Sequence, residues 1–192
     1  MRSFLITVIA ALLGRSPAFA VILGYDTLGA SEDNTNLYAN ANAFTATANG
    51  GAQTATACYG GSMDSGTGPV YVGLYDFGDG NISANNRLAV SSVITLTTTA
   101  QFVCANISIP AITNGVTYFI EAYSNTDFVN TRYTIGVTDQ FTNTTGGAAS
   151  PPDPHITREG TQDARISVYI SYAASGGVVC PSRSMLGVGC GL

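Results

Sequence analysis

The chain contains no lysine and no tryptophan, and its single histidine is His155. Proteins that bind nucleic acid need clustered Lys and Arg to neutralise phosphates, so the missing lysines and a net charge of −5 argue against such a partner. One histidine without a nucleophile motif does not make a catalytic triad, and we interpret His155 as a solvated loop residue. The sequence therefore predicts a protein that is not an enzyme.

Charged residues are also scarce, at 10% of the chain. A glycosidase needs two carboxylates about 5 to 10 Å apart across a cleft, and the sequence alone does not exclude such a pair in space. Several acidic residues instead lie in turn-like segments, where Asp is expected for its hydrogen bonds to the backbone. These residues are Asp64, Asp76, Asp79, Asp127, Asp139 and Asp153. No catalytic pair can be named from the sequence.

Residues 1–20 have the features of a cleaved secretory signal peptide. Arg2 precedes an apolar stretch from Phe4 to Gly14, and the segment closes with small residues at Ala18 and Ala20. The apolar stretch is about half of the roughly 20 residues that span a bilayer, which favours a cleaved signal over the alternative, a signal anchor. We expect a secreted protein, extracellular or on the cell surface, that does not span a membrane.

The four cysteines, an even number, are typical of disulfides in an oxidising compartment. Three pairings are possible, and we favour Cys58 with Cys104 in the body of the chain and Cys180 with Cys190 as a local loop. Zinc binding is the alternative, but the sequence has no CxxC pair and His155 is remote.

Short segments rich in Val, Ile, Thr, Tyr and Phe recur between clusters of Gly, Asn, Asp and Pro, a spacing typical of an all-β sandwich. The alternation of Ile166, Val168, Ile170 and Tyr172 with Ser167 and Ser171 is the clearest, and it predicts a strand with one wet face. The expected strands are Val21–Thr27, Asn42–Ala48, Ala52–Tyr59, Val70–Phe77, Leu88–Thr97, Gln101–Ile109, Thr117–Ser124, Arg132–Thr138 and Ala164–Tyr172. We predict an all-β, two-sheet antiparallel sandwich of about nine strands at residues 21–172, followed by a Gly- and Cys-containing tail at residues 173–192.

Turn residues separate the expected strands. The turn signals are Asn49-Gly50-Gly51, Gly60-Gly61, Asp79-Gly80-Asn81 and Asn114-Gly115, which supply residues that tolerate positive φ. Thr142 to Pro154 is expected to form a long surface loop.

The order of several short motifs resembles a group of jelly-roll, carbohydrate-binding-like modules in bacterial, archaeal and phage surface or appendage proteins. The motifs are Gly24 and Gly29, Phe44-Thr45-Ala46, Val70 to Asp76, Ile112 to Tyr118, Pro152-Asp153-Pro154, and Arg165 with Tyr169 and Tyr172. The resemblance covers nearly all of residues 21–172 and implies a jelly-roll topology used in adhesion or in building appendages and virions. The chain departs from the group by lacking Trp in the strand after the Gly-x-x-Tyr turn.

Two kinds of ligand site are suggested by the residues. Asp76, Asp79 and Asn81 form an oxygen-rich hairpin turn that fits Ca²⁺, the only cofactor suggested, although a plain turn explains the same residues. Tyr71, Tyr75, Tyr118 and Tyr123 are candidates for stacking against sugar rings, with core packing as the alternative. Asn143 begins an N-glycosylation triplet in the expected loop.

Two classes of function remain open after this reading. The first is a structural or adhesive subunit of a filament, sheath or virion, in which the apolar segment Val21, Ile22 and Leu23 is donated to the open sheet of another copy. The second is a carbohydrate-binding module that recognises a surface glycan. The absence of tryptophan favours the first class, so the expected partner is the protein itself, as a homopolymer.

Overall fold

The computed structural model describes residues 19–34, 38–77, 86–124, 126, 128–145 and 160–175. The described residues form twelve strands and no helix. The strands are β1 (Ala20–Gly24), β2 (Ser31–Asn34), β3 (Tyr38–Thr45), β4 (Gln53–Met63), β5 (Gly68–Asp76), β6 (Arg87–Val90), β7 (Ile94–Leu96), β8 (Gln101–Ile109), β9 (Thr117–Ser124), β10 (Val129–Thr145), β11 (Gly160–Ile166) and β12 (Val168–Ala173). No helix long and apolar enough to cross a membrane occurs in this part of the chain.

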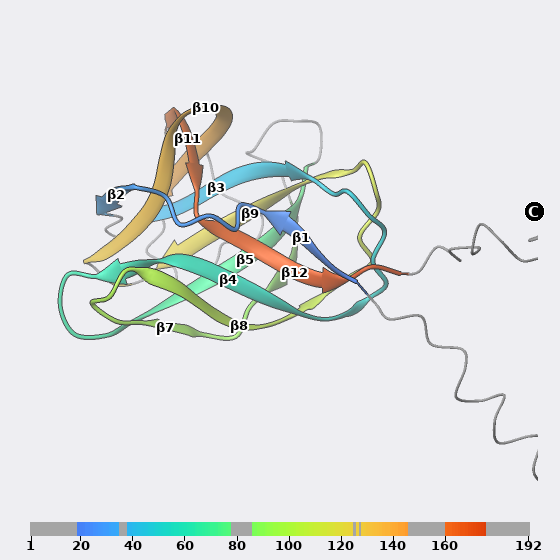
Figure 1. The fold of residues 1–192 in the computed structure, drawn as a ribbon, viewed down its shortest axis with the longest axis horizontal. Helices are drawn as coiled ribbons and strands as arrows, with labels where there is room; N and C mark the ends of the chain where they lie inside the picture. Colours follow the sequence, from blue (N-terminus) through green and yellow to red (C-terminus); the bar gives the residue numbers. More distant parts are fainter. Residues whose placement is uncertain are drawn as a thin grey trace, which may run out of the picture.

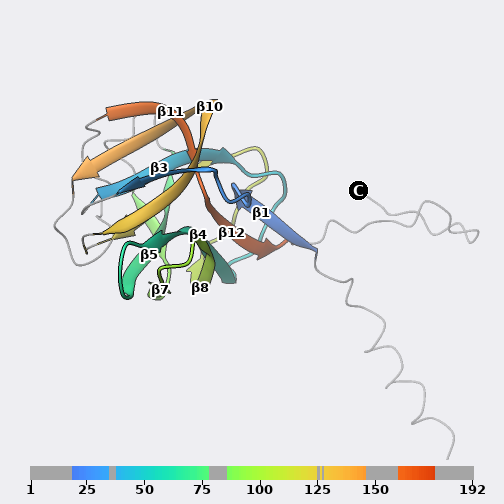
Figure 2. The same ribbon diagram turned by 60° about the vertical axis from the view of Figure 1, so that its left-hand side comes forward.

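The strands form two antiparallel sheets of seven and five strands, which confirms the predicted two-sheet sandwich. One layer contains the neighbours β1, β12, β4 and β8, and the other contains β3, β9, β5 and β6. Figure 2 shows β3, β10 and β11 on one side of the body and β4 and β8 on the other. The first and last strands of the described chain, β1 and β12, lie side by side (Figure 1).

Strand β10 belongs to both layers and joins them. Its first residues, Val129–Thr131, pair with the end of β4, whereas Thr142–Thr145 pair with β3. Between these segments the register toward β11 shifts after Ile135, and Gly136 has a φ of 80°. A bulge at a residue that accepts positive φ bends a strand sharply, so Gly136 lies where β10 changes layers.

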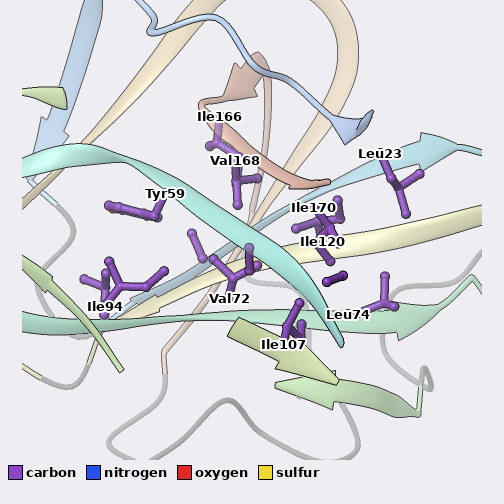
Figure 3. Packing of buried hydrophobic residues seen from close by; sticks show 14 of the residues in the cluster. Leu23, Tyr59, Val72, Leu74, Ile94, Ile107, Ile120, Ile166, Val168 and Ile170 are labelled. Carbon is purple, nitrogen blue, oxygen red and sulfur yellow. The ribbon is translucent and has the colours of Figure 1, made fainter. Parts of the chain in front are cut away.

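The main core lies between the two sheets and is aliphatic. Leu23 of β1, Ile120 of β9 and Ile170 of β12 are each at most 1% exposed and belong to one buried cluster. Figure 3 shows their side chains together with those of Val72, Leu74, Ile107, Ile166 and Val168 in the space between the strands. Burial of such side chains is the main favourable term in folding, which explains why the short alternating segments become strands.

The corner between β11 and β12 corrects the sequence interpretation of Ser167. The alternating residues Ile166, Val168, Ile170 and Tyr172 are all buried as predicted, but Ser167 is buried as well. Its N–H donates to Arg132 O at 2.8 Å and its carbonyl accepts from Gly60 N at 2.7 Å. The chain therefore turns at Ser167 from β11 into β12, and the side chain of Ser167 does not face solvent.

Other boundaries also differ from the expected ones. Gly60 and Gly61 were expected to form a turn, but they lie inside β4, where a Cβ at Gly60 would stand only 2.6 Å from Ser167 Cβ. The segment Leu88–Thr97 is two strands, β6 and β7, and the polar strand β2 was not expected. Thr142–Thr145 were expected to begin a loop but belong to β10, and the rest of that expected loop, residues 146–154, lies outside the described residues. Gln101–Ile109 and Thr117–Ser124 are confirmed as β8 and β9.

Candidate functional site

The apolar segment expected to act in assembly forms β1 and pairs with β12 of the same chain. The pairing joins five residue pairs, from Ala20 with Ala173 to Gly24 with Tyr169. It is extended by hydrogen bonds from Tyr25 N to Val168 O at 2.8 Å and from Ala174 N to Phe19 O at 3.0 Å. In the described part of the chain, β1 pairs with no other strand, so its second edge carries no backbone partner there.

The side chains of β1 divide between the core and the surface. Leu23 belongs to the main core, Val21 packs against that core, and Ile22 is 37% exposed. Because Tyr25 and Val168 exchange a backbone hydrogen bond, the pair Ile22 and Ser171 falls in the non-hydrogen-bonded class, in which Cα atoms approach to about 4.5 Å. One element thus supplies both an edge ladder and a buried leucine to the fold.

The residues proposed to bind Ca²⁺ are only partly described. Asp76 lies at the end of β5, where its carboxylate accepts hydrogen bonds from Asn86 N at 2.9 Å and from Asn86 Nδ2 at 3.0 Å. Asp79 and Asn81 lie outside the described residues. Within the described ranges, no group of three or more His, Cys, Asp or Glu is placed to hold a metal ion. The contacts of Asp76 are those of a side chain that closes a hairpin.

The tyrosines proposed to stack on sugars lie mostly inside the protein. Tyr75 and Tyr123 are fully buried and Tyr118 is 6% exposed, whereas Tyr71 is half-buried. The hydroxyl of Tyr75 donates to Glu121 Oε1 at 3.2 Å. Rings covered in this way pack against protein and present no face to a ligand. Three of the four tyrosines therefore pack inside the protein, as the alternative interpretation expected.

Glu121 and Tyr123 belong to a second buried region on β9. Residues 118–124 are all buried, although alternate residues of a strand point to opposite faces. Phe119 clusters with Ala41 and Tyr75 apart from the main core. Burial raises the pKa of Tyr123, and the neighbouring Glu121 and Tyr71 raise it further. The central strand of this sheet is therefore enclosed on both faces.

The disulfide between Cys58 and Cys104 is present, as predicted. The two residues lie directly opposite each other on β4 and β8, with their Cα atoms 4.1 Å apart. Cys58 is buried and Cys104 is exposed, so the bridge reaches the outer surface of the sheet that contains β4 and β8. A disulfide fits a protein of an oxidising compartment. Cys180 and Cys190 lie outside the described residues.

The strands around this disulfide have no charged side chains. Neither β1, β12, β4 nor β8 contains Asp, Glu, Lys or Arg. We call one group of outward residues on these strands the neutral face: Thr54 and Thr56 of β4, Asn106 and Ser108 of β8, and Tyr169 of β12. Thr56 lies opposite Asn106 and Thr54 lies opposite Ser108, and these four side chains are exposed. This face was not predicted from the sequence, although Thr54 and Thr56 alternate there with Ala55 and Ala57.

Asn143, the proposed glycosylation site, lies in β10 rather than in a loop. Its backbone pairs with Asn40 of β3 and with Gly160 of β11.

Comparison with known proteins leaves the fold and the surfaces as the basis for function. No protein-family model matches the chain, and no curated protein matches it.

Proposed function

We propose that the protein is a secreted, non-catalytic structural or adhesive subunit, with a β-sandwich of jelly-roll type, that polymerises by exchanging β1 between copies. The observation that supports this most directly is the position of β1. An apolar strand at the beginning of the described chain completes the β12 edge and fills the core with Leu23. Any second copy offers the same strand to the same edge with the same contacts.

The energetics of such an exchange favour assembly at high protein concentration. Because the exchanged strand makes the contacts that it makes within one chain, the enthalpy of the β1 interface is unchanged by exchange. The balance between monomer and polymer then depends on the connecting chain and on protein concentration. The exposed side chain of Ile22 adds apolar surface next to the joint between copies.

The glycan-binding alternative loses most of the residues on which it was based. Tyr75, Tyr118 and Tyr123 are enclosed, and a sugar needs an open ring for stacking. The strand-exchange proposal instead rests on the paired residues of β1 and β12, whose packing is known for both strands.

The first experiment links β1 covalently to the β12 edge that it occupies. Ile22→Cys and Ser171→Cys place two thiols at a non-hydrogen-bonded pair, a geometry comparable to that of Cys58 with Cys104. If copies exchange β1, non-reducing electrophoresis of polymers gives a ladder of linked chains, whereas dilute protein oxidised before assembly gives linked monomers that no longer polymerise. The single variant Ile22→Cys is the matched control and gives no ladder. Polymers whose chains are linked only within themselves would disprove strand exchange.

A second experiment supplies the strand from outside. A chain that lacks Val21 to Thr27 should not polymerise, and a synthetic peptide of residues 21–27 should bind to it and restore the melting transition of the full chain. A peptide with Leu23→Asp is the matched control, because a carboxylate in the core position of Leu23 has no partner there. Polymers that form without residues 21–27, visible by negative-stain microscopy, would refute the proposal.

A further inference from the structure

Strand β8 contains an acceptor triplet for N-linked glycans, Asn106-Ile107-Ser108. Asn106 and Ser108 are exposed, whereas Ile107 is 1% exposed and belongs to the main core. Because alternate residues of a strand point to opposite faces, the amide of Asn106 and the hydroxyl of Ser108 lie on the same outward face of the sheet. The two side chains that define the triplet are therefore both presented to solvent.

The side chain of Asn106 is free to carry a substituent. Within the described part of the chain it makes no hydrogen bond, although the backbone oxygen of Asn106 accepts one from Ser92 N at 2.8 Å. The main chain is therefore held at this point, while the fold does not use the amide. The neighbours of Asn106 on the same face are small: Thr56 lies opposite on β4, and Cys104 and Ser108 lie two residues away along β8. A bulky group at Asn106 thus meets no large side chain among these neighbours.

Exposure in the folded protein separates this triplet from the other two in the chain. An oligosaccharide is rich in hydroxyl groups, and burying them without partners costs free energy, so a glycan must end in solvent. The triplet Asn143-Thr144-Thr145 lies in β10 between β3 and β11, and Asn81-Ile82-Ser83 lies outside the described residues. Asn106 is the acceptor that the described structure shows in solvent.

The compartment expected for the protein is one in which this modification occurs. N-linked glycans are found on secreted proteins, and disulfides persist in the same oxidising environments. The chain combines the features of a secretory signal peptide with the disulfide between Cys58 and Cys104.

From these observations we infer that Asn106 is an N-glycosylation site, modified by transfer of an oligosaccharide from a lipid-linked diphosphate donor. In this step Nδ2 of Asn106 attacks the anomeric carbon of the sugar, and a C–N bond forms as the C–O bond to the diphosphate breaks. The diphosphate leaves with the electron pair, and one proton passes from Nδ2 to the surrounding water. The inference rests on one part of the proposed function, secretion, and does not depend on the exchange of β1.

The test is peptide mass spectrometry of the protein secreted by its own cells. The peptide that contains Asn106 should carry a glycan, and peptide N-glycosidase should remove it and convert the side-chain amide to a carboxylate. Ser108→Ala should abolish the glycan, because it removes the hydroxyl that the triplet requires, whereas Ser108→Thr should keep it. Ser108 is exposed, so both variants should fold, and a cooperative melting transition of each one checks this.

Thr145→Ala is the matched control, because it disrupts the triplet at Asn143 and leaves Asn106-Ile107-Ser108 intact. It should leave the glycan at Asn106 unchanged. An unmodified Asn106 in the secreted protein, or a glycan at Asn106 that remains in Ser108→Ala, would overturn the inference and leave strand exchange untouched. If the chain is absent from the secreted fraction and Asn106 is unmodified, the expected secretion is wrong, and the inference fails together with that part of the proposed function.

Discussion

At the scale of single residues, Ser167 holds the corner between β11 and β12 with its side chain as well as its backbone. Its Oγ accepts from Gly29 N at 2.8 Å and donates to Thr27 O at 3.0 Å. Ser167→Ala leaves Gly29 N and Thr27 O without their partner, the serine hydroxyl. We therefore expect a loss of about 1 to 3 kcal/mol in the free energy of unfolding. Urea denaturation measures it. Ser171→Ala, half-exposed on β12, is the control and should change stability by less than about 0.5 kcal/mol. Equal effects of the two variants would contradict the role of Ser167.

The raised pKa of Tyr123 leads to a prediction of how stability changes at alkaline pH. Burial, Glu121 and Tyr71 all raise its pKa in the folded protein. Above the ordinary tyrosine pKa of about 10 the unfolded chain releases this proton while the folded chain retains it, so stability falls as pH rises through that range. In Tyr123→Phe the fall should be shallower, whereas between neutral pH and the start of tyrosine ionisation the two proteins should show parallel stability. Urea denaturation across the alkaline range measures both slopes, and identical slopes would contradict the prediction.

At the scale of the element, Gly136 allows β10 to serve both sheets. A Cβ at this position meets no atom within 4 Å, so a substitution tests the backbone conformation alone. At a φ of 80° an L side chain costs about 1 to 2 kcal/mol, which is the loss expected for Gly136→Ala in urea denaturation. Gly136→Asn should lose less, because Asn tolerates positive φ. Gly51→Ala, also in open space but without positive φ, is the second control and should not destabilise the protein. A loss as large for Gly51→Ala would refute the strain argument.

The disulfide strengthens a pair of strands that are already hydrogen-bonded. Strands β4 and β8 pair from Gln53 with Ile109 to Gly61 with Gln101, and the bridge lies within this ladder. Replacing Cys58 and Cys104 together by Ala opens a loop of 46 residues in the unfolded chain and should cost about 2 to 4 kcal/mol. The fold itself should persist, since no pairing depends on the bridge. Circular dichroism and urea denaturation of the double variant measure these two outcomes, and loss of the β spectrum in water would contradict the second.

The elements also show where the sequence pattern is informative and where it is not. Alternating side chains located β8 and β9 because that signal is local, and grouping the four cysteines by region of the chain located the bridge. The corner at Ser167 was missed because burial continues with the same alternation on both sides of it. The glycines at 60 and 61 suggested a turn, but glycine also serves where two backbones approach closely.

At the scale of the whole molecule, the sequence could not show which surfaces remain open. Alternation along β9 places Tyr123 and Glu121 on the face opposite Ile120, and such a face is normally wet. Both residues are nevertheless buried, whereas Thr56 and Asn106 on the other sheet are exposed. The difference arises from contacts between distant parts of the chain, which a period of two residues does not encode. The exposed polar residues of the neutral face could therefore be recognised only when the layers were known.

Strand exchange makes one prediction that an ordinary interface would not. Leu23 is buried to the same extent whether β1 occupies its own sheet or that of another copy, so Leu23→Ala weakens monomer and polymer alike. The final fraction of polymer should change little. The rate should rise by about tenfold or more, because β1 must leave its edge first and the lost packing lowers that barrier by at least about 1.4 kcal/mol.

Light scattering gives the rate of assembly and sedimentation gives the final polymer fraction. Leu96→Ala is the control, because Leu96 is equally buried but lies on β7, away from the exchanging strand. It should destabilise the protein by a similar amount, about 2 to 5 kcal/mol, yet accelerate assembly less. If Leu23→Ala instead abolishes the polymer while its monomer still melts cooperatively, Leu23 stabilises a contact that only the polymer contains. Assembly would then proceed through a new interface rather than through the exchange of β1.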